Sequence, residues 1–253
     1  MSLDKGNIKA IYWDLDGTLA DTEINGHRLA FNMAFDKLEL PIIWEIEEYI
    51  SLLKISGGKT RIAYYCNSKN ISITQDYINK LHELKKEFYK TVLSQGNIQL
   101  RAGVARLIEE IHFHNIDQSI VTTSSLSAVN SFLEYILPPN LNVFKHIVSS
   151  EDVKFLKPSS EAYISAISKS GINRENILAI EDSFNGAEAA KRAGIKCLIT
   201  LPSWLKSITS DYKPYENVIS TLGDINNVVK VYNGPICTTN YINMDYISKI
   251  FLK

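Results

Sequence analysis

Short apolar runs recur along the chain, and each ends in polar residues. Residues 8–13 are apolar on both parities except for Lys9, and comparable runs return at 118–122 and 177–182. Apolar side chains on both parities are typical of a central strand whose two faces are both covered. These runs therefore predict strands of a parallel sheet, with their polar residues at the carboxyl ends.

Stretches with helical periodicity lie between and after the predicted strands. Gly171 and Gly194 stand where the C-terminal caps of two such helices belong. Strands that alternate with helices of this length favour an α/β fold with a doubly wound, Rossmann-like parallel sheet. The predicted helices cover residues 103–114, 125–137, 160–170 and 184–193.

The segment from about residue 22 to residue 95 has helical patterns and no convincing strand. In its last part Ile78, Leu81 and Val92 recur at helical spacing, with Lys and Glu between them. A helical block inserted directly after the first strand is expected to cover that strand's end. We therefore expect a core domain of residues 1–20 and 96–253 and an inserted all-helical cap domain of residues 21–95. The helices predicted for the cap cover residues 22–38, 45–54, 58–67 and 74–94.

The charge balance bears on which partners the protein has. The 27 Lys and Arg residues nearly cancel the 28 Asp and Glu residues, which leaves a net charge of −1. No field of the whole molecule therefore attracts nucleic acid or an anionic membrane. No apolar run reaches the roughly 18 residues that a membrane span needs. We expect a monomer that binds a small molecule, with neither nucleic acid nor membrane as a partner.

The cysteines and the first residues bear on the compartment. Cys66, Cys197 and Cys237 are far apart and odd in number, so they form neither a disulfide framework nor a zinc motif. Asp4 and Gly6 stand where a signal peptide would be apolar, and the opening Met-Ser-Leu is interpreted as an expression leader. A reducing, cytoplasmic location is expected.

Asp14 and Asp16 follow the first predicted strand. Because they are two positions apart in an extended backbone, their side chains point the same way, and Gly17 then permits a sharp turn. Two such carboxylates repel each other unless a cation or a shared proton intervenes. One suits a nucleophile or metal ligand and the other a proton shuttle. An isolated Asp-x-Asp more often belongs to a solvated loop or a helix cap, so the other motifs of the chain decide whether this pair is catalytic.

Further polar residues are expected at the same edge, because the active site of an open α/β sheet lies outside the carboxyl ends of its strands. Thr122 ends the second run and offers a hydroxyl to an anionic oxygen, although Thr123 or Ser124 takes this place if the strand register slips. Lys157, before a proline and a helix, would neutralise a phosphate. Glu181-Asp182 ends the third run with hard oxygen ligands suited to Mg²⁺.

The order of these motifs resembles that of the haloacid-dehalogenase phosphatases. The residues that carry the resemblance are Asp14-Leu15-Asp16-Gly17-Thr18, Thr122, Lys157-Pro158 and Glu181-Asp182-Ser183. The insertion point of the helical segment is similar to that of the capped subgroup, which includes beta-phosphoglucomutase and phosphoglycolate phosphatase.

Within this subgroup the chain resembles the CbbY-like branch, from about residue 8 to about residue 223. Members from photosynthetic organisms remove a phosphate from xylulose-1,5-bisphosphate, an inhibitor of Rubisco. Trp13 stands where Phe is usual, and the tail after about residue 224 is longer and carries no recognisable chemistry. The resemblance also admits a plastid stroma as the location. The stretches that carry the resemblance are Leu19–Glu23, Gly26–Arg28, Ala30–Asn32, Leu52–Lys59 with Arg61, and Glu181–Gly186, which includes Asn185.

The resemblance implies a mechanism. Asp14 would attack phosphorus, and Asp16 would protonate the leaving oxygen and later activate water. Mg²⁺ would be held by Asp14, the backbone carbonyl of Asp16 and Asp182, with Glu181 in or next to the coordination sphere. The metal, Lys157 and Thr122 would share the phosphoryl charge.

Cationic residues of the predicted cap are candidates for a second phosphate of the substrate. Each is equally well interpreted as a solvated charge, but together they form a cluster to which arginine adds bidentate contacts. These candidates are His27, Arg28, Lys59 and Arg61. The further candidates for substrate contacts are Glu23 and Tyr49, which would bind sugar hydroxyls, and Thr123 and Asn185.

Gly58-Lys59-Thr60 also has the ending of a phosphate-binding P-loop. That motif needs a glycine where Leu53 stands and a strand before it, whereas residues 45–54 have a helical pattern, so we reject it. The sequence therefore predicts a Mg²⁺-dependent phosphatase of a small sugar phosphate, with xylulose-1,5-bisphosphate as the leading substrate. The alternatives are a mutase of the beta-phosphoglucomutase type and a catalytically silent sugar-phosphate-binding module.

Overall fold

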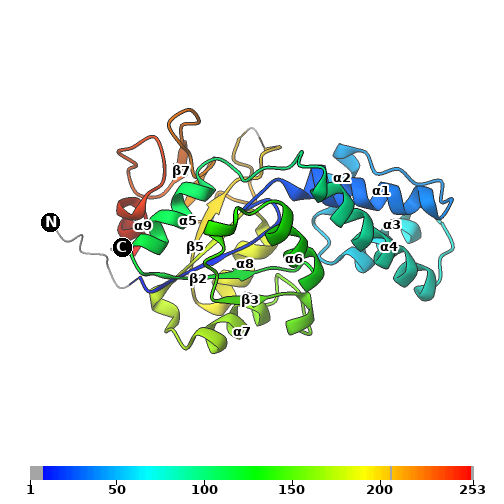
Figure 1. Cartoon of the computed structure of the whole chain (residues 1–253), viewed down its shortest axis with the longest axis horizontal. Coiled ribbons are helices and arrows are strands. Elements are labelled where there is room, and N and C mark those ends of the chain that lie inside the picture. The colour runs from blue at the N-terminus through cyan, green and yellow to red at the C-terminus, as the bar shows by residue number, and fades with distance from the viewer. Residues whose placement is uncertain (1–7, 206, 252–253) are drawn as a thin grey trace.

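The structure is a computed structural model that describes residues 8–205 and 207–251. Its centre is a seven-stranded sheet of order β3-β2-β1-β4-β5-β6-β7, parallel except for the antiparallel pair β6–β7 (Figure 1). The predicted parallel α/β fold is confirmed. The strands are β1 (Ala10–Trp13), β2 (Asp117–Val121), β3 (His146–Val148), β4 (Ile177–Glu181), β5 (Lys196–Thr200), β6 (Val218–Ile219) and β7 (Val231–Asn233).

The central strand β1 is buried on both faces, as its apolar run predicts. Ile11 and Trp13 point into one hydrophobic cluster, whereas Ala10 and Tyr12 point into another on the opposite face. The alternation follows from the two-residue period of a strand. The predicted run at 8–13 becomes a strand only from Ala10 onward.

Helices cover both faces of the sheet. The cluster with Trp13 contains apolar side chains of α5, α6 and α9, and the cluster with Tyr12 contains those of α7 and α8. Gly171 and Gly194 have φ angles of 67° and 74°, the left-handed conformation expected of C-terminal caps. The helices are α5 (Val104–Phe113), α6 (Leu126–Tyr135), α7 (Glu161–Ser170), α8 (Phe184–Ala193) and α9 (Met244–Phe251), with short 3₁₀ turns at Pro139–Leu141, Ser150–Asp152 and Arg174–Asn176.

Between β1 and α5 the chain forms helices gathered at one end of the molecule (Figure 1). They pack around a hydrophobic cluster of their own, which includes Phe31, Trp44, Tyr49 and Leu81. Thr74 caps the long α4, its hydroxyl accepting from the Tyr77 amide at 3.3 Å. This helical segment comprises a π-helical turn (Glu23–His27), α1 (Arg28–Lys37), α2 (Ile46–Leu52), α3 (Gly58–Ser68) and α4 (Gln75–Ser94).

The C-terminal tail belongs to the core of the sheet domain. β7 extends the sheet, and Tyr246, Ile247 and Ile250 of α9 are buried in the same cluster as Trp13. Arg106 fastens the tail to α5 by donating to the carbonyls of Gly223 and Ile242, at 3.2 and 2.7 Å. The tail therefore contributes packing that its sequence alone does not reveal.

Two expectations concern the ends of the chain and the membrane. The opening Met-Ser-Leu, interpreted as a leader, lies outside the described residues. Among the helices that the structure describes, none has both the length and the apolar character of a membrane span.

Candidate active site

Polar side chains from separate segments meet at the carboxyl edge of the sheet. Asp14 follows β1, Thr122 follows β2, and Glu181 and Asp182 stand at the end of β4. All of them are buried, as is Lys157, which enters from the segment before α7. They meet because the central strands β1, β2 and β4 are parallel neighbours and so present the same ends at the same edge.

Lys157 is the cation of this cluster. Its Nζ donates to Asp14 Oδ1 at 2.7 Å, to Glu181 Oε1 at 2.6 Å and to the Val121 carbonyl at 2.7 Å. Although burial alone favours the neutral amine, the charges of Asp14 and Glu181 raise the pKa of Lys157 above its ordinary value. Lys157 is therefore a fixed positive charge beside Asp14.

Asp14, Glu181 and Asp182 form a buried acidic cluster with ligand atoms within 4.8 Å of one another. Burial raises the pKa of Asp14 to about 8, with Glu181 adding to the effect against the attraction of Lys157. Burial and the Asp14 charge raise the pKa of Asp182 as well. Three carboxylates facing one ammonium leave an excess of negative charge, which is the environment that a divalent cation balances.

Two glycines allow the acidic cluster to be so compact. A Cβ on Gly17, whose φ is +86°, would lie 2.1 Å from Asp182 Oδ2, and one on Gly186 would lie 1.9 Å from Glu181 Oε2. Glu181 Oε2 is also a buried oxygen without a hydrogen-bond partner within the described part of the chain. The donor set consists of hard carboxylate oxygens, one of them unpaired, and it fits Mg²⁺.

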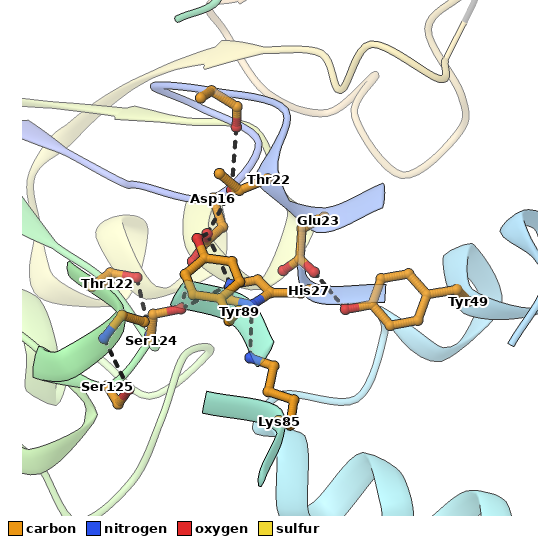
Figure 2. A network of polar contacts seen from close by, with 12 residues as sticks. Asp16, Thr22, Glu23, His27, Tyr49, Lys85, Tyr89, Thr122, Ser124 and Ser125 are labelled. Carbon is orange, nitrogen blue, oxygen red and sulfur yellow. Dashed lines mark hydrogen bonds and ion pairs between the residues drawn. The ribbon is translucent and has the colours of Figure 1, made fainter. Parts of the chain in front are cut away.

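Asp16 points toward the helical segment and accepts several hydrogen bonds (Figure 2). Its Oδ1 accepts from the Thr22 hydroxyl at 2.6 Å and contacts His27 Nε2 at 3.0 Å, and its Oδ2 accepts from the Ser124 hydroxyl at 2.5 Å. Burial by itself raises the pKa of Asp16, but the interaction with His27 and the bonds from Ser124 and Thr22 hold that pKa well below its ordinary value. The surroundings therefore favour the ionised carboxylate.

A buried lysine of α4 stands behind His27. Lys85 Nζ lies 2.7 Å from His27 Nδ1, and the Tyr89 ring stacks on the imidazole with centroids 4.0 Å apart (Figure 2). Burial lowers the pKa of Lys85 to about 8, against the attraction of Asp16 and Glu23. Asp16, His27 and Lys85 thus form a polar chain from the sheet edge into the helical segment.

The site opens into two adjoining cavities that share Glu23, Gly57, Arg61 and Thr123. The reaction cavity, about 570 Å³, has Asp14, Asp16, Thr122, Lys157 and Asp182 in its wall, together with Asn185 and Trp204. The cationic cavity, about 250 Å³, is lined on its basic side by His27, Lys59, Arg61, His82, Lys85 and Lys86. Thr60, Ser124, Ser125 and Ser150 add hydroxyl groups to the same lining.

The structure brings together only part of the predicted cap cluster. His27, Lys59 and Arg61 line the cationic cavity, but Arg28 lines neither cavity and donates to the Trp44 carbonyl at 3.1 Å. Arg61 is buried and bonded within the helical segment, to the carbonyls of Leu52 and Ile55 and to the Tyr49 hydroxyl. Lys59 is exposed and donates to Asn79 at 2.8 Å.

Of the remaining residues predicted to contact the substrate, some line a cavity and others are packed within the protein. Glu23 lines both cavities, and its Oε2 accepts from the Tyr49 hydroxyl at 2.8 Å. Tyr49 itself lines neither cavity. Thr123 lines both, whereas the Thr122 hydroxyl accepts from the Ser124 amide at 3.0 Å. The amide of Asn185 reaches across to the helical segment.

Sequence reasoning missed several residues of the site. Lys85 occupies a buried position of the α4 stripe between Leu81 and Tyr89, and a lysine on an apolar stripe was the signal that could have drawn attention to it. His82 and Lys86 flank it in the cationic cavity. Ser124 entered only as a substitute for Thr122, but its hydroxyl binds Asp16.

Known proteins share the fold of this chain. A family model for haloacid dehalogenase-like hydrolases matches residues 11–200. The chain belongs to this family, as the order of its motifs predicts.

The similarity to CbbY proteins covers most of the chain. The chain is 37% identical over 194 residues to Protein CbbY of Cereibacter sphaeroides, a match that spans 76% of this chain and 84% of that protein. It is 30% identical over 223 residues to a CBBY-like protein of Arabidopsis thaliana, across 85% and 69% of the two chains. A crystal structure of mutant CbbY from Rhodobacter sphaeroides in complex with xylulose-(1,5)bisphosphate superposes with a TM-score of 0.79 at 32% identity, covering 87% of this chain and 98% of that one.

Proposed function

We propose that the protein is a Mg²⁺-dependent phosphatase that hydrolyses a phosphorylated sugar through an aspartyl-phosphate on Asp14. The observation that carries the proposal is the buried group of Asp14, Lys157, Glu181 and Asp182, of which Asp14, Lys157 and Asp182 line the reaction cavity. A carboxylate beside a fixed ammonium and a cation-binding cluster is equipped to attack a phosphoryl group. The CbbY relatives support the same activity.

The reaction has two steps. In the first, a carboxylate oxygen of Asp14 forms a bond to phosphorus, the ester P–O bond breaks, and Asp16 gives a proton to the leaving sugar oxygen. In the second, Asp16 takes a proton from water, which attacks phosphorus and releases Asp14. The donors around Asp16 favour its ionised form, which is the form required of the base in the second step. The proton that Asp16 takes from water in that step is the one that it gives to the leaving oxygen of the next substrate.

The other groups hold charge and position. Lys157 supplies a permanent positive charge, and Thr122, at the end of β2, offers its hydroxyl to a phosphoryl oxygen. Asp14 and Asp182, the Asp16 carbonyl and nearby Glu181 would hold Mg²⁺, which when bound neutralises phosphoryl charge as a Lewis acid. The helical segment acts as a cap that closes over the sheet edge and limits access of bulk water.

The substrate class is a sugar bisphosphate, with xylulose-1,5-bisphosphate as the leading member. One phosphate would lie at Asp14 and the other in the cationic cavity, where Lys59 and Lys86 reach the lining from α3 and α4. Glu23, on the boundary of both cavities, is placed to accept hydrogen bonds from sugar hydroxyls between the phosphates. The relative crystallised with xylulose-(1,5)bisphosphate supports this assignment.

A panel of sugar mono- and bisphosphates tests the proposal. Inorganic phosphate should be released from a bisphosphate with Mg²⁺ present, and most efficiently from a ketopentose bisphosphate. Accumulation of an isomeric sugar phosphate without free phosphate would instead indicate a mutase. Binding of sugar phosphates without turnover of these or of p-nitrophenyl phosphate would indicate a silent binding module.

A further inference from the structure

Asn185 makes a polar contact between the sheet domain and the cap. It lies in the first turn of α8, three residues after Asp182, and its Nδ2 donates to the Lys54 carbonyl at 3.2 Å and to Ser56 Oγ at 3.1 Å. Both acceptors belong to the loop between α2 and α3, residues 53–57, which we call the cap loop. One side-chain amide thus uses both of its hydrogens on a loop more than a hundred residues away in the sequence.

The cap loop lies where the two cavities adjoin. Ser56 lines the reaction cavity, Gly57 lines both, and Gly58 and Lys59 continue into the cationic cavity. The position of the loop therefore determines how far the cationic cavity lies from Asp14. A substrate with two phosphates must match that distance, whereas one with a single phosphate need not.

Apolar contacts place the sheet domain against the same loop. A Cβ on Gly57, whose φ is +88°, would lie 2.9 Å from Leu156 Cδ1, next to Lys157. Trp204 of the sheet domain packs against the same hydrophobic cluster as Leu53 and Ile55 of the loop. Apolar contacts are not directional and permit sliding. The paired hydrogen bonds of Asn185 require a particular distance and angle, and they fix the loop in one position.

We infer that Asn185 is a positioning residue that holds the cap loop against the sheet domain and thereby sets the spacing between the phosphoryl site and the cationic cavity. The inference rests on the proposed function, because it assigns the cationic cavity to a second phosphate. Asn185 would then determine selectivity for bisphosphates through Lys54 and Ser56, without a bond of its own to the distal phosphate.

The test is the variant Asn185→Ala in the full chain with Mg²⁺. We expect kcat/KM for the bisphosphate to fall about tenfold, mainly through KM, because two neutral hydrogen bonds are lost. The KM for p-nitrophenyl phosphate, which does not span both cavities, should change less than about twofold. Amide hydrogen exchange of residues 53–61 should become faster in the unliganded variant, a readout that does not depend on turnover.

A double-mutant cycle of Asn185→Ala with Ser56→Ala tests whether the hydrogen bond between these two side chains is responsible. Ser56→Ala alone should reduce bisphosphate kcat/KM by about threefold, and adding it to Asn185→Ala should cause no further loss, because the shared bond is already absent. Asn233→Ala is the matched control, since the Asn233 amide also donates to two backbone carbonyls, of Lys213 and Tyr215, but none of these three residues lines either cavity. Its kinetic constants should equal those of the wild type.

The outcomes separate this inference from the proposed function. If the wild type hydrolyses a bisphosphate and Asn185→Ala does so with unchanged KM, or if the two losses in the cycle simply add, Asn185 does not position the loop. An equal loss on p-nitrophenyl phosphate would overturn the inference as well, because it would place Asn185 at the reacting phosphoryl group. A wild type without activity on any bisphosphate would instead contradict the proposed substrate.

Discussion

Lys85 donates a hydrogen bond to Nδ1 of His27 at 2.7 Å, deep between α4 and the π-helical turn. Because an ammonium has only hydrogens to offer, Nδ1 must accept, and the neutral imidazole therefore carries its proton on Nε2. Nε2 in turn lies 3.0 Å from Asp16. A lysine of the helical segment thus selects the tautomer that donates to the proposed acid and base of the reaction.

Replacing Lys85 by Met should slow sugar-phosphate turnover by roughly ten- to a hundredfold, the range for a lost hydrogen bond from a charged donor. His27 would be free to take the other tautomer and to turn away from Asp16. The loss should be smaller with p-nitrophenyl phosphate, whose leaving group needs little protonation. Lys80→Met, an exposed position on the same helix, is the control. Equal losses on both substrates would speak against a role through Asp16.

The same lysine should give the fold a pH dependence. Burial lowers the pKa of Lys85 to about 8, whereas the unfolded chain keeps a pKa of about 10.4. Between these values the unfolded state binds more protons, so wild-type stability should rise with pH in this window relative to Lys85→Met. Urea unfolding of both proteins at about pH 7.5 and about pH 10, below this window and near its upper end, measures the difference in the free energy of unfolding. If the difference in unfolding free energy between the two proteins is the same at both pH values, Lys85 does not carry a buried charge.

Asp14→Asn should reduce turnover at least about a thousandfold, because an amide is a far poorer nucleophile than a carboxylate. The fold should remain intact, since the substitution removes one of three clustered negative charges. Circular dichroism and phosphate release check the two halves of this expectation. Near-normal activity of the purified variant in Mg²⁺ would exclude an aspartyl-phosphate on this residue.

The metal-free protein should become less stable as pH rises from about 4 to about 8. The folded-state pKa of Asp14 is raised to about 8 by burial, above the unfolded value of about 3.9, so the folded state binds more protons in this range. Mg²⁺ should reverse the loss by balancing the carboxylates. Thermal unfolding with EDTA or with excess Mg²⁺ tests this. If Mg²⁺ does not change the melting temperature at about pH 8, the acidic cluster does not bind Mg²⁺.

Asp182→Ala should raise the Mg²⁺ concentration needed for half-maximal activity steeply, because magnesium sites use few protein carboxylates. Titration of EDTA-treated enzyme with Mg²⁺ gives this value, and the Mg²⁺-induced rise in melting temperature should weaken in parallel. An unchanged requirement in the variant would remove Asp182 from the ligand set.

The cationic cavity should discriminate between one and two phosphates. Lys59→Ala should lower kcat/KM for bisphosphates by roughly tenfold or more and spare p-nitrophenyl phosphate, because an exposed lysine supports little else. Arg28→Ala should leave selectivity unchanged, since Arg28 lines neither cavity. Arg61→Ala should lower activity on both substrates, because this buried arginine supports the cap loop through Leu52 and Ile55. A reversed pattern for Arg28 and Lys59 would place the second phosphate elsewhere.

The sequence by itself determined the class of the fold and the reacting end of the site. Strands β1, β2 and β4 are long enough and apolar enough to be recognised, and parallel strands place Asp14, Thr122 and Asp182 at one edge by geometry alone. Strands β3, β5, β6 and β7 were not predicted. Three of them, β3, β6 and β7, have only two or three residues, which carry no period and pair only once the sheet exists.

The tertiary structure decided which partners the polar residues of the helical segment have. Arg28 and Lys59 look alike in the sequence as free cations, but helix packing turns Arg28 toward the Trp44 carbonyl and leaves Lys59 at a cavity. Lys85 and Asn185 acquire their partners, His27 and the cap loop, across 58 and about 130 residues of chain. Such pairings depend on how separate elements dock, and a local pattern of side chains contains no record of that docking.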